Sequence, residues 1–231
     1  MLSAIHISKS FGVETVLDAV TFHLNAGERL GLVGPNGCGK TTLLRILAGL
    51  SNPSKGEVLL EGRSARDEQA RRRRGVLGHG IGVYDELSAR ENLLLFARLY
   101  GVKRPRETAA QWLERTGLAS VAEAPAREFS RGMRQRLALA RVFLHEPSLL
   151  LLDEPFTSLD DRAIALLQEL LREALGRGAT VVMSTHQLRE ALELATHAAL
   201  LVRGRLSYSG ARTPEMAADP GWLYRHYGEA A

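Results

Sequence analysis

The sequence predicts an α/β fold whose core is a mostly parallel sheet flanked by helices, and three observations lead to this prediction. The stretch Gly34–Thr42 fits G-x-x-x-x-G-K-[ST] and stands between a predicted strand and a predicted helix. Residues Leu149–Leu152 are four consecutive leucines, which is typical of a strand that a parallel sheet buries on both faces. Between them, residues 82–147 carry helix signals throughout, which indicates a helical subdomain inserted into the core.

The first 33 residues are predicted to form an antiparallel β part. Turn signals at Gly12 and at Asn25–Gly27 separate short runs rich in strand-forming residues. The last run leads directly into the glycine-rich stretch. The predicted strands are Leu2–Ile7, Val20–Leu24 and Arg29–Val33.

A helix is expected over Leu43–Ala48, and Gly49 is its expected stop because glycine favours the left-handed residue that ends many helices. Two further short strands follow, at Gly56–Leu60 and Val76–His79. The basic run Arg71–Arg74 lies between them and predicts a solvated connector. A nucleic-acid-binding patch is the less favoured alternative for this run, and we expect no nucleic-acid partner.

The helical block contains three predicted helices with distinct start signals. Ser88 and Glu91 have the spacing of a capping box, and the helix that they open ends at Gly101. The second helix follows Pro105 and runs to Gly117. Ser130 is the expected N-cap of the third helix, which runs from Arg131 to about His145.

The core is expected to resume after Pro147. Asp160 and Asp161 precede a helix with leucines at helical spacing, and Thr180–Ser184 reads as the next strand. A hairpin is predicted around Arg203–Gly204, followed by a tail with one short helix and a loose end.

Composition limits the class of protein. The chain has 231 residues, of which 45% are hydrophobic, and a net charge of +4. Its single cysteine, Cys38, excludes an intrachain disulfide and fits a reducing compartment. No secretory signal is recognisable, and no apolar run reaches the ~18 residues that a bilayer span needs. If the protein acts at a membrane, another chain must provide the span.

The residue types of the glycine-rich stretch predict a phosphate-binding loop. Glycines let the backbone wrap an anion with its N–H groups turned inward, and the following helix points its positive end at the same place. Lys40 would reach the β- and γ-phosphates, and the Thr41 hydroxyl would hold Mg²⁺. A chance glycine-rich turn is the alternative, which the flanking strand and helix disfavour. The candidate nucleotide-binding residues are Gly34, Pro35, Asn36, Gly37, Cys38, Gly39, Lys40, Thr41 and Thr42.

Two carboxylates and a histidine follow the next predicted strands. Asp153 and Glu154 come at the end of the leucine strand, where a parallel sheet would place them at the same edge as the phosphate loop. Asp153 would hold Mg²⁺ through water, and Glu154 would orient or deprotonate the attacking water. His186 follows the next strand and is a candidate switch or water-orienting residue. A structural loop at Asp-Glu-Pro, or a structural histidine, is the alternative.

A second anion site is predicted at the start of the third helix. Ser130, Arg131 and Gly132 open this helix, whose N-terminus is a favourable seat for a phosphate. The simplest ligand is a phosphate held by another molecule, which predicts a head-to-tail dimer with two nucleotides at a two-fold interface. An ordinary capped helix is the alternative.

The ordered set of motifs resembles the ABC-type ATPases, the nucleotide-binding subunits of ABC transporters. Gly34–Thr42 resembles the Walker A motif, Leu149–Glu154 the Walker B motif with its catalytic glutamate, and Phe129–Met133 the signature motif. Ser158–Asp160 resembles the D-loop and His186 the switch histidine, while Phe11 is at the position that stacks on adenine. Leu77–Leu93 together with Asp153–Thr157 is also similar to haem-exporter ATPases of cytochrome c maturation, and drug-export ATPases have comparable stretches.

The resemblance implies a P-loop NTPase core that binds ATP and Mg²⁺. Residues 1–81 and 148–231 would form the nucleotide-binding core, and 82–147 the helical subdomain carrying the signature. It also implies a homodimer or heterodimer of ATPase subunits, peripheral on the cytoplasmic face of the membrane and bound to a transmembrane permease on a separate chain. Lys40, Glu154 and His186 would be catalytic, and Ser130–Gly132 would contact the partner's ATP.

Two departures from the family pattern matter. The signature reads Phe-Ser-Arg-Gly-Met, which keeps Ser130 and Gly132 but lacks the second glycine and the glutamine. Gly80 stands where the family has a glutamine that touches Mg²⁺ and links the site to the membrane subunit. We expect activity to survive, with looser or rerouted coupling.

The leading hypothesis is therefore an ATP-hydrolysing motor subunit that drives transport, with export favoured. A soluble ABC ATPase acting on nucleic acid or ribosomes is the alternative, but such proteins usually carry two cassettes or long coiled-coil arms. A regulatory module that binds without hydrolysis is disfavoured because Lys40, Asp153, Glu154 and His186 are all present.

Overall fold

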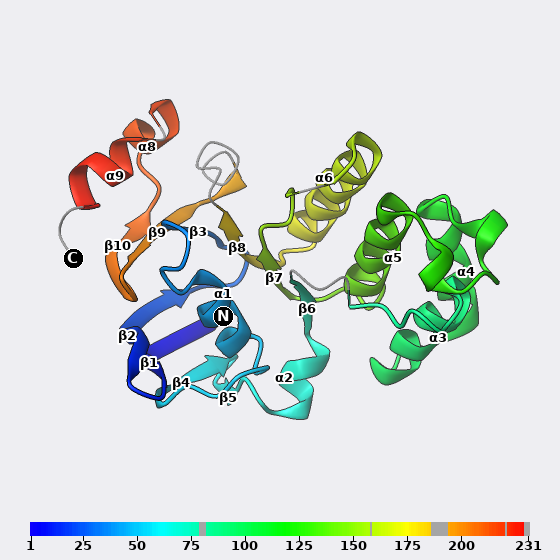
Figure 1. The fold of residues 1–231 in the computed structure, drawn as a ribbon, viewed down its shortest axis with the longest axis horizontal. Coiled ribbons are helices and arrows are strands. Elements are labelled where there is room, and N and C mark those ends of the chain that lie inside the picture. The colour runs from blue at the N-terminus through cyan, green and yellow to red at the C-terminus, as the bar shows by residue number, and fades with distance from the viewer. Residues whose placement is uncertain (79–81, 158, 186–193, 220, 229–231) are drawn as a thin grey trace. The chain divides into compact units, whose positions relative to one another are not determined.

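The computed structural model describes residues 1–78, 82–157, 159–185, 194–219 and 221–228. Its contacts divide the chain into two compact units. The first unit contains both sheets, and the second is helical (Figure 1). The first comprises Met1–Val76, Ser148–Pro155 and Gly178–Ala231, and the second comprises Leu77–Pro147 and Phe156–Arg177.

An antiparallel sheet of four strands opens the first unit, in the order β2-β1-β4-β5. Its first hairpin is longer than predicted, because pairing continues to its tip, where Phe11 faces Glu14 across Gly12 and Val13. Gly12 has φ 58°, a left-handed conformation that suits so short a turn. The strands are β1 (Leu2–Phe11), β2 (Glu14–Leu24), β4 (Lys55–Leu60) and β5 (Arg63–Ser64).

The second sheet has six strands in the order β10-β9-β3-β8-β7-β6. Strands β9, β3, β8 and β7 pair in parallel, so their carboxyl ends reach one edge, and β10 returns antiparallel to β9 in the predicted hairpin. The α/β fold with a mostly parallel sheet is thereby confirmed. The strands are β3 (Arg29–Val33), β6 (Arg74–Leu77), β7 (Leu149–Asp153), β8 (Thr180–Thr185), β9 (His197–Val202) and β10 (Arg205–Ala211).

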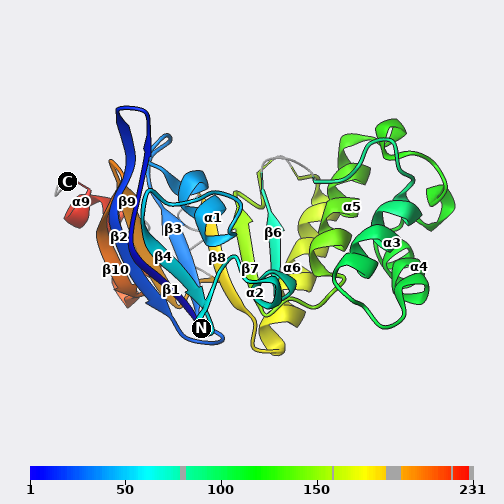
Figure 2. The same ribbon diagram turned by 90° about the horizontal axis from the view of Figure 1, so that it is seen from below.

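Helix α1 (Lys40–Leu47) lies between the two sheets (Figures 1 and 2). Its apolar residues join one continuous core with side chains from both sheets. Leu43 and Leu47 are completely buried, and burial of a leucine contributes about 1.5–3 kcal/mol. The helix that follows the phosphate loop is therefore anchored on two sides. Its apolar residues are Leu43, Leu44, Ile46 and Leu47.

The helical unit packs around its own core. The predicted capping box is present, with Glu91 N–H donating to Ser88 Oγ and Ser88 N–H donating to Glu91. The buried Asn92 side chain accepts from Tyr84 N–H and donates to the carbonyls of Tyr84, Leu87 and Ser88, which fixes the loop before the helix. The long helices are α3 (Ala89–Leu99), α4 (Pro105–Arg115), α5 (Arg131–Phe143) and α6 (Asp161–Gly176).

The prediction of a solvated connector at Arg71–Arg74 holds for Arg71–Arg73, which are exposed and lead into β6, but not for Arg74. A short helix, α2 (Glu68–Arg72), begins at an Asp67 cap, and Arg74 is buried on β6 with its guanidinium donating to the Ala65 carbonyl. A run of four arginines gives no sign that one of them turns inward. The carbonyl partner, Ala65, lies outside the run, between β5 and α2, so the run by itself does not reveal the contact.

Two further differences concern the C-terminal half. The tail forms two short helices, α8 (Pro214–Ala218) and α9 (Trp222–Tyr227), where one was predicted. Helix α6 packs with α5 in the helical unit, whereas the sequence suggested grouping it with the core. The predicted subdomain limits at 81/82 and 147/148 stay predictions. Within the described residues, the structure contains no helix that is both long and apolar enough to cross a membrane.

We expect Ser88→Ala to lower the free energy of unfolding by about 1 kcal/mol, because it leaves the Glu91 N–H without its cap. Urea denaturation followed by Trp112 fluorescence, with Trp222→Phe in every sample, measures the change. Ser120→Ala, at an exposed position, is the matched control. Equal midpoints for the two variants would contradict a stabilising role for the capping box.

Candidate active site

The glycine-rich stretch forms a loop between β3 and α1 in which two glycines have no room for a side chain. A Cβ on Gly34 would lie 2.3 Å from the Leu201 carbonyl oxygen, and one on Gly39 would lie 2.8 Å from Leu17 Cδ2. Gly39 is the N-cap of α1 in a left-handed conformation, φ 108°. Because Gly39 carries no capping side chain, an anion can approach the positive end of α1.

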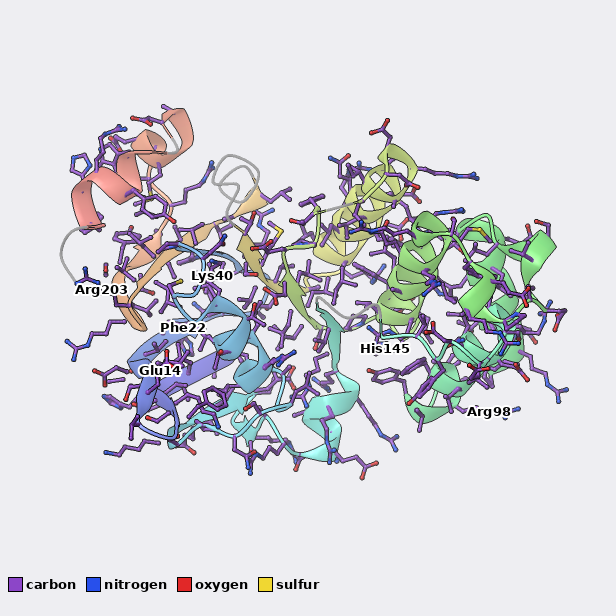
Figure 3. The ribbon with its side chains drawn as sticks, viewed as in Figure 1. Glu14, Phe22, Lys40, Arg98, His145 and Arg203 are labelled. Atoms are coloured by element: carbon purple, nitrogen blue, oxygen red, sulfur yellow. The ribbon has the colours of Figure 1, made fainter. Side chains whose placement is uncertain are left out.

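Lys40 is the first residue of α1, and only 6% of it is exposed (Figure 3). Its ammonium donates to the carbonyl oxygens of Gly34 and Pro35, at 2.8 and 2.9 Å. The loop thus curls around a buried positive charge. Phosphate oxygens are stronger acceptors for such a charge than neutral carbonyls are.

Asp153 ends β7 beside the start of α1. The Thr41 hydroxyl donates to Asp153 Oδ2 at 2.8 Å, and the Ser184 hydroxyl donates to Asp153 Oδ1. Asp153 is 6% exposed, so these hydrogen bonds offset part of the cost of burying its charge. A hydroxyl and a carboxylate oxygen are hard ligands of the kind that Mg²⁺ takes together with phosphate oxygens and water, so this pair fits the ion.

Glu154 directly follows and has a strained backbone, with φ 49°. Its N–H donates to the Ser184 carbonyl at 3.0 Å and lies 3.2 Å from the Ser184 hydroxyl. Left-handed conformations are uncommon outside glycine, asparagine and aspartate, and they occur often at functional sites. The neighbouring strand β8 holds this conformation in place.

Ser184 is a site residue that sequence reasoning missed. It is fully buried at the end of β8 and faces Asp153 across the parallel pair. Its hydroxyl contacts both the carboxylate and the backbone that follows it. The only signal was a hydroxyl residue at the end of an apolar strand. Ser184 therefore positions the Asp153 carboxylate and the Glu154 backbone.

Cys38 lies inside the phosphate loop, and only 6% of it is exposed. Burial raises the pKa of its thiol, and the nearby Lys40 charge opposes this effect in part. The reactive thiolate form is therefore disfavoured at neutral pH.

Phe11 projects at the tip of the β1–β2 hairpin, and 57% of it is exposed. A ring exposed in this way is available for stacking. His186 and Gly80, together with Ser158 of the predicted D-loop, lie outside the described residues.

The predicted signature turn belongs to the helical unit. Ser130 caps α5, its hydroxyl accepting from Met133 N–H at 3.3 Å, and both Ser130 and Arg131 are exposed. A Cβ on Gly132 would lie 2.2 Å from Asp160 Oδ2. A side chain at position 132 would therefore displace the carboxylate of Asp160, which caps α6 by accepting from Ala163 N–H.

The structure thus brings four of the predicted site residues together at the carboxyl edge of the six-stranded sheet, namely Lys40, Thr41, Asp153 and Glu154. A phosphate cradle, a buried cation, a cluster of hard oxygen ligands and a partly exposed carboxylate next to it suit phosphoryl transfer to water.

Comparisons with known proteins agree with this chemistry. The family model described as ABC transporter matches residues 17–157. The Nod factor export ATP-binding protein I of Paraburkholderia xenovorans (strain LB400) is 39% identical over 93% of this chain and 72% of its own length. The protein of the same name from Rhizobium sp. (strain N33) is 39% identical over 86% of this chain and 67% of its own length.

Two solved structures are similar over nearly the whole chain. The structure of an ATP binding subunit of an ABC transporter has a TM-score of 0.85 and 30% identity, covering 99% of this chain and 93% of that one. A dimeric post-hydrolysis structure of the ATP-binding cassette MJ0796 bound to ADP and Pi has a TM-score of 0.80 and 26% identity. It covers 92% of this chain and 99% of that one. The chain therefore belongs to the ABC transporter family, as an ATP-binding and ATP-hydrolysing subunit.

Proposed function

We propose that this subunit closes with a second ATPase subunit around two ATP molecules, and that hydrolysis drives export through a separate transmembrane permease. The Thr41–Asp153–Ser184 network beside the phosphate loop is the observation that carries the proposal, because it places hard oxygen ligands next to a buried lysine. The names of the relatives, which are export proteins, favour export. The dimeric state of a similar cassette supports a dimer.

ATP would bind with its phosphates in the Gly34–Thr42 loop. The N–H groups at the start of α1 would donate to the phosphate oxygens. Lys40 would exchange its two carbonyl partners for oxygens of the β- and γ-phosphates, so its charge stays compensated in both states. The exposed ring of Phe11 would stack on adenine.

Thr41 and Asp153 would hold Mg²⁺, Asp153 through water. The ion supplies positive charge that offsets the charge developing on the transferred phosphoryl group. The Ser184 hydroxyl keeps the carboxylate in one orientation for this task.

Glu154 would orient the attacking water and accept its proton. Its backbone N–H is fixed by β8, so the carboxylate starts from a defined position one residue beyond Asp153. His186, which follows β8 in the sequence, would assist.

Ser130, Arg131 and Gly132 would complete the site of the partner subunit. The turn presents a helix N-terminus, an exposed hydroxyl and an exposed cation, a combination that suits an incoming phosphate. Arg131 would offset the missing signature glycine and glutamine by adding positive charge.

The subunit would sit peripherally on the cytoplasmic face of the membrane. Tyr84, which is exposed on the helical unit and stacks on Phe96 at 6.0 Å, would contribute to the surface that meets the permease. The names of the relatives favour Nod-factor-like cargo over the haem or drug cargo that the sequence motifs suggest.

Glu154→Gln is expected to reduce steady-state ATP hydrolysis by at least about a hundredfold, because the amide cannot accept the water proton. An ATP-bound dimer should accumulate, which sedimentation velocity detects. Glu57→Gln, at an exposed site on β4, is the control and should match wild type. Wild-type turnover in Glu154→Gln would refute the role given to this carboxylate.

The composite site predicts a specific cross-link between subunits. Asn36→Cys and Arg131→Cys, combined in a Cys38→Ser, Glu154→Gln background, should yield a disulfide-linked dimer on oxidation with ATP present. Both positions are exposed. Replacing Arg131→Cys by Arg106→Cys, on an exposed part of α4, gives the control. Equal cross-linking in the two pairs, or none with ATP, would exclude the sandwich arrangement.

Cys38 should react slowly with iodoacetamide in the native protein. Its raised pKa leaves less thiolate at a given pH than an ordinary cysteine has, so the labelling rate should keep rising at pH values where a free thiol has levelled off. Labelling is measured by mass spectrometry, with urea-denatured protein as the reference. Rapid labelling of the native protein at pH 7 would contradict the burial, and ATP should slow the reaction further.

A further inference from the structure

A lysine lies against the exposed aromatic ring of the first hairpin. Lys9 Nζ is 4.8 Å from the centroid of the Phe11 ring, within the range of a cation–π contact. The two residues are two apart on β1, so their side chains emerge on the same face of the strand. Phe11 remains 57% exposed despite this contact, so much of the ring is open to a second partner.

Hydrogen bonds of Lys9 and of the neighbouring Ser10 to the segment after α1 hold Lys9 in this position. Its ammonium donates to the Asn52 carbonyl at 2.8 Å, and Asn52 lies in the segment that follows α1. The β1–β2 pairing shifts register on both sides of Lys9, an irregularity of the kind that re-aims side chains near functional sites. The neighbouring Ser10 N–H donates to Ser54 Oγ in the same segment, which ties the hairpin down next to Lys9.

We propose that Lys9 is a positioning residue for nucleotide binding, which acts through Phe11 by holding a cation on one face of the ring while adenine stacks on the other. The proposal rests on the proposed function, in which Phe11 receives the base. A cation above an aromatic ring draws on its negative face and reduces the electron density facing a second ring. The opposite face of Phe11 then repels the adenine π-system less.

The contact also limits the motion of an otherwise exposed ring. A side chain ordered before the ligand arrives loses less conformational entropy on binding. The Asn52 hydrogen bond connects this preorganisation to the end of the helix that carries the phosphate loop. Lys9 would therefore strengthen recognition of the base without touching the phosphates.

Calorimetric titration of the full chain with a non-hydrolysable ATP analogue and with inorganic tripolyphosphate separates these effects. Lys9→Met, which keeps the length of the side chain without its charge, is expected to weaken binding of the ATP analogue about two- to fivefold. Binding of tripolyphosphate, which has no base, should not change. Lys9→Arg should restore the affinity for the analogue, because arginine also makes cation–π contacts.

The matched control is Lys55→Met, which removes one exposed lysine charge from β4 and should leave both affinities unchanged. In a Phe11→Leu background, Lys9→Met should have no further effect on the analogue, because the two residues act as one unit. Unchanged or tighter analogue binding in Lys9→Met, or an equal loss for tripolyphosphate, would overturn the proposal. If the wild-type protein bound neither compound, the proposed function itself would fall, and this inference with it.

Discussion

The buried carboxylate of Asp153 is the constraint on which the rest of the site depends. A charge with so little exposure is costly unless hydrogen-bond donors surround it, and here the donors are hydroxyls from α1 and β8. One side chain therefore joins three elements that are far apart in the sequence. This arrangement requires parallel pairing of β7 with β8 and packing of α1 between the two sheets. The apolar core therefore fixes the positions of the polar residues around Asp153.

Several residues near this carboxylate have backbone conformations or close contacts that are unfavourable for most amino acids. Glu154 has a left-handed backbone although it is not glycine. A Cβ at Gly34 or Gly39 would come too close to neighbouring atoms, so both positions favour glycine. Such conformations persist only where surrounding structure enforces them. The enforcing contacts are those of β8 with Glu154 and of Leu201 and Leu17 with the two glycines. The helical unit has a parallel case, since Asp160 occupies the space beside Gly132.

Much of the fold was accessible from sequence because its elements have local signals. The Ser88–Glu91 capping box, the strand Arg29–Val33 and the leucine strand depend on residues close in sequence, and the structure has all three. The first hairpin was predicted too short, because Lys9, Ser10 and Glu14 give weak strand signals that cross-strand pairing overrides. Within the run Arg71–Arg74, the sequence did not reveal helix α2 or the burial of Arg74, because both depend on partners outside the run.

By itself the sequence determined the phosphate loop between strand and helix, the acidic pair after a buried strand, and the capped helix at Ser130. Each of these depends on backbone geometry set within a few residues. Only the tertiary structure decided that Ser184 positions Asp153, that the Asp160 carboxylate lies against Gly132, and that Lys9 lies over Phe11. These contacts need strand register, helix packing or a bulge. Such features follow from how a whole core packs, and no local pattern of residues encodes them.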